Sequence, residues 1–299
     1  MEKITQKAYA KINLGLDVLS RRPDGYHLVK MIMQTVDLYD LLTIEKTNEP
    51  GIQFKLLQDG QAVTTLVPED DTNLVCKAAR KLMEKTGRNL GVSFTLQKNI
   101  PVAAGMAGGS TDAAAALTGM NRLFALGLSD EELREIAVTI GADVPYCIMG
   151  GTALSEGIGE ILTPLPSPPQ VPLVIVKPDV SVSTKAVYEN LHVESLQKHP
   201  DIDGMIEAIK KGDLTGMTDR MENVLETVTI ALHPVIAKIK RLLEQQGAIK
   251  ALMSGSGPTV FAVFEEEAKA DAAAKVLETT GHRVIRTTFV NPKSKEEFK

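Results

Sequence analysis

The chain has 299 residues, 43% of them hydrophobic, which is enough for one large or two medium-sized domains with a sizeable core. A formal net charge of −5 and the absence of tryptophan argue against a nucleic-acid-binding surface. The longest apolar runs, such as 171–176, are far too short to span a membrane, and no apolar segment follows the first residues, so we expect a cytoplasmic protein without a secretory signal. Two cysteines are too few for a disulfide framework, and the five histidines show no metal-binding spacing.

The first half of the sequence predicts a mixture of strands and helices. Residues 8–18 alternate apolar and polar side chains, which predicts a half-buried strand with Lys11 and Asn13 on its polar face. Ser129 and Glu132 have the spacing of a capping box at the start of a helix. Further strands are expected over 28–46, 51–57 and 92–98, and further helices from 73 to about 85 and over 110–126.

A proline-rich stretch separates the two halves. Residues 163–172 contain five prolines and are interpreted as a linker, which places a domain boundary after residue 162. The second half predicts strands over 173–177, 249–253, 259–264 and 282–290, and helices over 184–191, 202–211, 214–229, 234–246 and 267–280. This mixture favours an α+β architecture in which helices cover one face of each sheet.

A glycine-rich segment before the predicted helix 110–126 has the features of a phosphate-binding loop. Glycine lets backbone N–H groups approach an anion, and a helix N-terminus adds unpaired N–H groups and a positive dipole end. Two hydroxyl side chains follow the glycines and add further donors. The loop consists of Pro101, Val102, Ala103, Ala104, Gly105, Met106, Ala107, Gly108, Gly109, Ser110 and Thr111. A tight loop before an ordinary helix is the alternative interpretation.

This loop matches none of the common nucleotide-binding motifs. A Walker A loop requires a Gly-Lys dipeptide, which the chain lacks, and the dinucleotide fingerprint G-x-G-x-x-G is also absent. The protein-kinase signatures His-Arg-Asp and Asp-Phe-Gly do not occur either. The loop is therefore a phosphate site of another type.

Three segments together resemble the GHMP small-molecule kinases, a superfamily that includes galactokinase, homoserine kinase and mevalonate kinase. The glycine loop is similar to the family's ATP loop, and Leu252-Met-Ser-Gly-Ser-Gly-Pro-Thr259 is similar to its third motif. The N-terminal segment from Ala8 to His27, with Asp-Gly-Tyr-His at its end, resembles one branch, whose members phosphorylate 4-diphosphocytidyl-2-C-methyl-D-erythritol in the non-mevalonate route to isoprenoid precursors. The resemblance covers nearly the whole chain.

The resemblance implies a two-domain fold. It implies an N-terminal ribosomal-protein-S5-like ATP-binding domain over 1–162, with a substrate-binding hairpin at about 11–31. It also implies a ferredoxin-like α/β sandwich over 163–299 that binds substrate.

The resemblance also assigns the chemistry to two residues. Asp143, in Gly-Ala-Asp-Val-Pro, matches the segment that carries the catalytic aspartate, and it would act as general base toward the substrate hydroxyl or orient that hydroxyl. Lys11 would lie beside it, where it would hold Asp143 ionised and lower the pKa of the hydroxyl, or neutralise the γ-phosphate. From position alone, Asp143 is better explained as a turn residue and Lys11 as a solvated lysine, and the resemblance reverses both interpretations.

The same branch implies a site for a cytidine diphosphate substrate. Tyr26 and His27 would hold the cytosine, with Tyr188 as a second stacking residue. Asn13 and Thr184 would bind the diphosphate or the methylerythritol end, and Ser254, Gly255, Ser256 and Gly257 would close around phosphate through backbone N–H groups. Lys98 and Asn73 fit positions near the adenine of ATP. A packed surface Tyr-His pair and a tight β-turn are the alternatives for 26–27 and 254–257.

The implied co-substrate is ATP, and Mg²⁺ is expected with it. A hydroxyl of Ser110 or Thr111 can hold Mg²⁺, whereas Asp112 is already explained by the helix dipole, so no firm metal ligand is named. The expected partner is a small molecule, with no nucleic acid or membrane, and the protein is expected to be a monomer or weak homodimer.

Two alternatives to this function remain: another GHMP kinase of the mevalonate or homoserine type, and a non-catalytic GHMP-fold binding protein.

Overall fold

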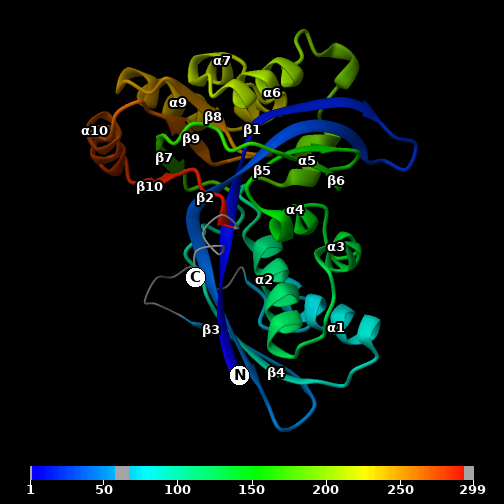
Figure 1. The fold of residues 1–299 in the computed structure, drawn as a ribbon. Coiled ribbons are helices and arrows are strands. Elements are labelled where there is room, and N and C mark those ends of the chain that lie inside the picture. The colour runs from blue at the N-terminus through cyan, green and yellow to red at the C-terminus, as the bar shows by residue number, and fades with distance from the viewer. Residues whose placement is uncertain (1, 58–66, 293–299) are drawn as a thin grey trace. The chain divides into compact units, whose positions relative to one another are not determined.

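The computed structural model describes residues 2–57 and 67–292 as two compact units whose segments alternate along the chain. The first unit holds 1–10, 38–102 and 107–149, and the second holds 11–37, 103–106 and 150–299. Strands β1 (Lys3–Arg21) and β2 (His27–Lys46) each contribute residues to both units (Figure 1). The predicted division between residues 162 and 163 stays a prediction.

The first unit packs helices against paired strands. The helices are α1 (Leu74–Thr86), α2 (Gly108–Leu123), α3 (Asp130–Val138) and α4 (Val144–Met149). Strand β3 (Gly51–Leu57) pairs in parallel with β4 (Gly91–Gln97), which pairs antiparallel with residues 41–46 of β2. Ile44 and Phe94 face each other in this register and are fully buried, as are the alanines along α2. The small alanine side chains let α2 pack closely among α1, α3 and α4 (Figure 1).

The second unit contains a four-stranded antiparallel sheet in the order β10-β7-β9-β8. Helices α9 and α10 pack against it on one side (Figure 1). A second group of strands joins residues 31–34 of β2 to β5 and β5 to β6. The elements are β5 (Thr152–Glu156), β6 (Ile161–Leu165), β7 (Pro172–Lys177), α5 (Thr184–Glu189), α6 (Ile202–Lys211), α7 (Leu214–Asp219), α8 (Glu226–Leu232), α9 (Val235–Gln245), β8 (Lys250–Met253), β9 (Val260–Val263), α10 (Glu267–Glu278) and β10 (Arg283–Thr288).

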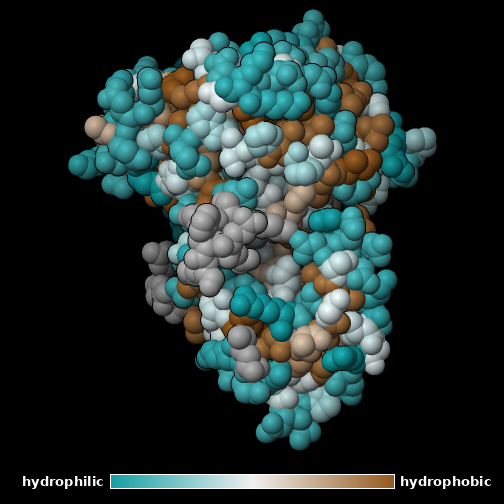
Figure 2. Space-filling model, in the orientation of Figure 1, coloured by the Kyte–Doolittle hydropathy of each residue, from teal (hydrophilic) through white to brown (hydrophobic). Residues whose placement is uncertain are grey.

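The helix α6 illustrates how hydrophobic patterning fixes an element in place. Its apolar residues Ile202, Met205, Ile206 and Ile209 recur at helical spacing and are buried, while its charged residues remain outside. Figure 2 shows the resulting hydrophilic surface over α6 and α7. None of the helices in the described ranges combines the length and apolar character that a membrane crossing needs.

Most elements predicted from the sequence are confirmed, and two local signals are confirmed in detail. Asn73 caps α1 by accepting a hydrogen bond from the Val75 N–H, and Ser129 forms the predicted capping box with Glu132. The linker prediction for 163–172 was wrong at both ends, because residues 161–165 form β6 against β5 and Pro172 begins β7. Proline is tolerated there, since Pro164 lies in a terminal strand of its sheet and Pro172 opens its strand.

The prediction of a half-buried strand over 8–18 was also wrong. Both faces of the strand are buried from Ala10 to Val18. The polar face is covered within the second unit, where a side chain on Gly15 would come within 2.8 Å of Ile202 and where Asp17 contacts His199 at 2.8 Å. Alternation therefore identified the strand, but the polar residues on it are enclosed and hydrogen-bonded.

The predicted helix 214–229 is divided into α7 and α8 by an extended segment around Asn223. The Leu16 N–H of β1 donates to the Glu222 carbonyl (2.9 Å), and the Val224 N–H donates back to the Leu16 carbonyl (3.0 Å). These two bonds pair the segment with β1, and they require an extended backbone at a place where local propensity favoured a helix.

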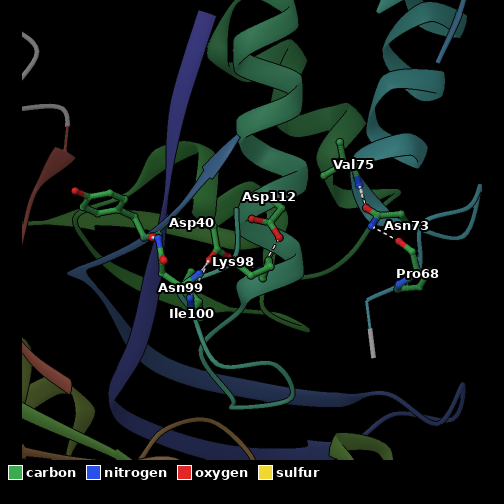
Figure 3. Close-up of polar contacts among 9 residues, drawn as sticks. Asp40, Pro68, Asn73, Val75, Lys98, Asn99, Ile100 and Asp112 are labelled. Atoms are coloured by element: carbon green, nitrogen blue, oxygen red, sulfur yellow. Dashed lines mark hydrogen bonds and ion pairs between the residues drawn. The ribbon is translucent and has the colours of Figure 1, made fainter. Parts of the chain in front are cut away.

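A buried ion cluster joins three elements of the first unit (Figure 3). The Lys98 ammonium, just after β4, pairs with Asp40 of β2 and lies 2.7 Å from Asp112 Oδ2 of α2. Asp40 Oδ1 also accepts the backbone N–H groups of Asn99 (2.5 Å) and Ile100 (2.8 Å). The cluster fixes β4 and the first turn of α2, which are the segments on either side of the glycine loop.

The cluster contains one basic group, the Lys98 ammonium, and two acidic groups, the carboxyl groups of Asp40 and Asp112. Burial lowers the pKa of Lys98, but the charges of Asp112 and Asp40 raise it more, so the net shift is upward. Burial raises the pKa of Asp112 from the ordinary 3.8 to about 8, against the Lys98 charge and with help from Asp40. One ammonium therefore faces two carboxyl groups, and a proton on Asp112 makes the cluster neutral at neutral pH.

We predict that Asp112→Asn gains stability relative to the wild type as pH rises. Between the unfolded pKa of about 3.8 and the folded pKa of about 8, the folded wild type holds a proton that the unfolded chain lacks, so its stability falls with increasing pH. The variant has no such group. Urea unfolding at about pH 5.5 and about pH 8 measures the free energy of unfolding of both proteins. The value for Asp112→Asn minus the value for the wild type should be more positive at the higher pH.

Asp130→Asn is the matched control, since Asp130 is an exposed acid in the first turn of α3. Its effect should be the same at both pH values. A pH-independent difference for Asp112→Asn would mean that Asp112 is ionised throughout this range.

Candidate active site

The glycine loop turns sharply before α2 through residues with left-handed backbone. Gly105 has φ +70°, and the two alanines Ala103 and Ala107 have φ +52° and +58°. Thr111 is the first residue of α2 whose N–H bonds back along the helix, to the Ala107 carbonyl. The N–H groups of Gly108, Gly109 and Ser110 therefore have no helical acceptor and are placed to receive an anion.

The carbonyl of Gly105 connects two segments of the second unit, because side chains from both donate hydrogen bonds to it. It accepts hydrogen bonds from the Ser254 hydroxyl (3.0 Å) and from the Lys11 ammonium (3.4 Å). The Lys11 backbone N–H also donates to the Met106 carbonyl (3.2 Å). Residues 103–106 are thus held by β1 and by the turn that follows β8.

Lys11 and Asn13 are neighbours on one face of β1, as the alternation predicted. The Lys11 ammonium donates to Asn13 Oδ1 at 2.9 Å, and the Asn13 amide contacts the Met31 sulfur at 3.2 Å. Both side chains are buried. Because a buried ammonium is stabilised by carbonyl oxygens around it, these bonds orient the charge of Lys11 at the glycine loop.

The turn 254–257 approaches the glycine loop backbone to backbone. A Cβ on Gly105 would lie 2.4 Å from the Ser254 carbonyl oxygen, so no other residue fits at position 105. Within the turn, the Ser254 N–H bonds to the Thr259 carbonyl and the Gly257 N–H bonds to the Ser254 carbonyl, each at 2.9 Å. The third motif is therefore a tight turn, and its other N–H groups, on Gly255 and Ser256, are the ones that can receive phosphate.

Three residues that the sequence analysis did not identify hold this turn from behind. The Asn223 amide donates to the carbonyls of Met253 and Gly255, both at 2.8 Å. Glu226 accepts the Met253 N–H (2.8 Å), and the Thr229 hydroxyl donates to the Ser256 carbonyl (3.1 Å). They lie in the segment that was expected to be one continuous helix, so no local pattern marked them.

The predicted base-binding residues His27 and Tyr188 come together in the second unit. Their ring centroids are 5.1 Å apart with planes tilted by 40°. Burial, and then the nearby charge of Arg21, lower the pKa of His27, which favours the neutral imidazole. His27 Nε2 is buried and has no hydrogen-bond partner among the described residues. Tyr26, the third predicted base-binding residue, is 60% exposed.

The helix α5 connects this aromatic pair to the turn 254–257. Ser183 caps the helix, and the Thr184 hydroxyl lies 2.8 Å from the Ser256 hydroxyl. Tyr188 follows one helical turn later, so Thr184 and Tyr188 lie on one side of the helix, as expected. The predicted substrate residues of the second unit therefore form a continuous row from His27 to Ser256.

The remaining predicted residues belong to the first unit. Asp143 is half-buried and directly precedes α4, where its carbonyl accepts the Cys147 N–H (3.1 Å). Asn73 uses its amide on the Pro68 carbonyl (2.7 Å) and its oxygen on the cap of α1 (Figure 3). Lys98 lies within 3.3 Å of the position of a Cβ on Gly108 and is bound by Asp40 and Asp112. The nucleotide roles of Asn73 and Lys98 stay predictions, and both side chains have structural roles.

Within residues 2–57 and 67–292, no three His, Cys, Asp or Glu side chains gather as a metal-binding group. Besides the ammonium groups of Lys11 and Lys98 and the carboxyl group of Asp112, the polar groups at the glycine loop are hydroxyls and backbone N–H groups, which are suited to phosphate oxygens. A metal ion in such a place takes most of its ligands from phosphates and water.

Two family models match the sequence, one in each half. The N-terminal domain model of the GHMP kinases matches residues 73–151, and the C-terminal model matches residues 205–283. A protein of Lachnoclostridium phytofermentans named 4-diphosphocytidyl-2-C-methyl-D-erythritol kinase is 54% identical over 91% of this chain and 92% of its own length. A protein of Lachnospira eligens with the same name is 52% identical over 96% of this chain and 98% of its own length.

Solved structures agree with these matches. A crystal structure of 4-(cytidine 5'-diphospho)-2C-methyl-D-erythritol kinase has a TM-score of 0.80 at 32% identity, covering 96% of this chain and 99% of that one. Homoserine kinase from Cytophaga hutchinsonii shares the fold, with a TM-score of 0.77 at 19% identity over 97% of this chain and 95% of that one. The predicted α+β fold is confirmed, and the chain belongs to the GHMP kinases, a family of ATP-using small-molecule kinases.

Proposed function

We propose that this chain transfers the γ-phosphoryl group of ATP to the 2-hydroxyl of 4-diphosphocytidyl-2-C-methyl-D-erythritol, giving the 2-phosphate and ADP in the non-mevalonate route to isoprenoid precursors. The observation that carries the substrate is the His27–Tyr188 pair, with its buried, unpartnered imidazole nitrogen. A neutral imidazole beside an aromatic ring can hydrogen-bond the edge of a cytosine while the ring stacks on its face. The names of the relatives at 54% and 52% identity support the same substrate.

The nucleotide end of the proposed site is the glycine loop. The unpaired N–H groups of Gly108, Gly109 and Ser110 would bind the ATP phosphates, helped by the dipole of the long helix α2. The N–H groups of Gly255 and Ser256 would bind phosphate on the substrate side. The contacts at Gly105 support this arrangement, since they bring the two glycine-rich segments together within the second unit.

Lys11 and Asp143 are the proposed catalytic residues. Phosphoryl transfer needs positioning and charge stabilisation more than covalent chemistry by the protein. Asp143 would accept the proton of the substrate 2-hydroxyl or orient it, and Lys11 would stabilise negative charge at the attacking oxygen or on the γ-phosphate. The bonds from Lys11 to Asn13 and Gly105 support this role, because they fix the ammonium next to the glycine loop.

Mg²⁺ fits this donor set as an ion held mainly by ATP phosphates and water, with a hydroxyl of Ser110 or Thr111 as the protein ligand. When bound, it neutralises charge on the transferred phosphate. We further propose that the enzyme acts in the cytoplasm as a monomer or weak homodimer and takes only small-molecule partners.

The first test is substrate choice. We expect ADP release with ATP, Mg²⁺ and 4-diphosphocytidyl-2-C-methyl-D-erythritol, and none above background with mevalonate or homoserine. Turnover on either of these alcohols would identify another type of GHMP kinase. ATP binding without turnover on any of them would identify a non-catalytic binding protein.

We predict that Asp143→Asn lowers kcat by about 10²- to 10⁴-fold, because it removes the proton acceptor and preserves the shape of the side chain. The affinity for ATP, measured by titration, should stay within about twofold of the wild type. Equal losses of turnover and of ATP binding would show that Asp143 is a structural residue.

We predict that His27→Ala raises the KM for the cytidylyl substrate by roughly 2- to 10-fold, the range expected for losing one hydrogen bond to the edge of the cytosine. The KM for ATP should change little, because the pair His27–Tyr188 is assigned to the cytosine. His192→Ala, at an exposed histidine of the same unit, is the control. Similar changes in both KM values would contradict the cytosine assignment.

A further inference from the structure

We propose that Ser254 is a positioning residue of the nucleotide loop: its hydroxyl holds the Gly105 carbonyl and thereby fixes the backbone that receives the phosphates of ATP. This differs from the expectation that Ser254 contacts the substrate. The proposal rests on the proposed function, because it takes the glycine loop as the ATP site.

Both hydrogen-bond donors of Ser254 are already used, so the residue has no N–H or O–H group left for a phosphate ligand. Its side chain and backbone are fully buried, with 0% exposure. Its N–H donates to the Thr259 carbonyl, its carbonyl accepts the Gly257 N–H, and its hydroxyl donates to the Gly105 carbonyl. A ligand would have to break one of these bonds to reach the residue.

The glycine loop needs contacts of this kind to keep its shape. Ala103 and Ala107 have positive φ angles on either side of Gly105, a conformation that disfavours residues with a Cβ. Such backbone persists only where surrounding contacts hold it. Residues 103–106 receive those contacts from Ser254 and from Lys11, through the carbonyls of Gly105 and Met106.

The turn that carries Ser254 is itself well fixed. Asn223 binds the carbonyls on both sides of Ser254, and Glu226 binds the N–H of Met253. The close approach of Gly105 to the Ser254 carbonyl leaves no space between the two segments. Ser254 therefore connects a fixed turn to a strained loop, which is the arrangement required of a positioning group.

The experiment compares two serines of one turn. Ser254→Ala removes the hydroxyl that binds Gly105, and Ser256→Ala removes the hydroxyl that binds Thr184. The affinity for ADP with Mg²⁺, measured by titration without alcohol substrate, should fall about 3- to 10-fold in Ser254→Ala, as expected for one lost hydrogen bond. In Ser256→Ala it should stay within about twofold, while the KM for the cytidylyl substrate rises.

Ser254→Cys addresses the packing of the turn, because it keeps the side-chain shape and weakens the donor. It should show the same selective loss of ADP affinity with an unchanged unfolding midpoint. An unchanged ADP affinity in both Ser254 variants, with a raised KM for the alcohol, would overturn the proposal and make Ser254 a substrate residue. Equal ADP losses in the Ser254 and Ser256 variants would also overturn it.

The ADP titration separates this proposal from the proposed function. If the enzyme proves to act on another alcohol, the ADP result for Ser254 still decides the positioning role. If the wild type binds no nucleotide, both the proposed function and the positioning role of Ser254 are wrong.

Discussion

The buried ammonium of Lys98 is the interaction on which the first unit depends most. It pairs with two carboxyl groups, one of which carries a proton, at the place where β2, β4 and α2 meet. Removing Lys98 would leave the charge of Asp40 buried without a counter-charge, which is strongly destabilising in protein interiors. The arrangement is therefore a geometric constraint: the strand before the glycine loop and the helix after it cannot separate without exposing the cluster.

The second unit constrains the middle of the same loop by different means. Here the contacts are hydrogen bonds to carbonyl oxygens, from a lysine on β1 and a serine after β8. The loop is thus a strained segment whose ends and centre are determined by separate sets of contacts. The ends of the loop are fixed by the Asp40–Lys98–Asp112 ion cluster in the first unit, and its centre, at Gly105, is fixed by hydrogen bonds from the Lys11 ammonium and the Ser254 hydroxyl in the second unit.

The sequence predicted the elements whose signals are local. Alternation located β1, and the capping box of Ser129 with Glu132 located α3. It did not predict the burial of Asp17 or the break before α8, because both result from pairing with residues far along the chain. Local propensity cannot predict such contacts, because the sequence around each residue carries no signal of a partner far along the chain.

The candidate site divides in the same way. Motif resemblance identified the glycine loop, the turn 254–257 and the pair His27–Tyr188, and the structure brings the last of these together. It did not identify Asn223, because the carbonyls that its amide binds lie 30 and 32 residues further along the chain. The sequence analysis did not predict the ion pair between Asp40 and Lys98 either, because the two residues are 58 positions apart.

The alternation of the two units along the chain has a consequence for synthesis. In residues 11–37 the strands β1 and β2 pair with each other, yet most of the elements that cover them lie beyond residue 150. The second unit therefore cannot complete its contacts until β10 has been synthesised, whereas all of the first unit is available once residue 149 has been synthesised. Because β1 and β2 run through both, no single cut in the chain would release either unit as an independently encoded fragment.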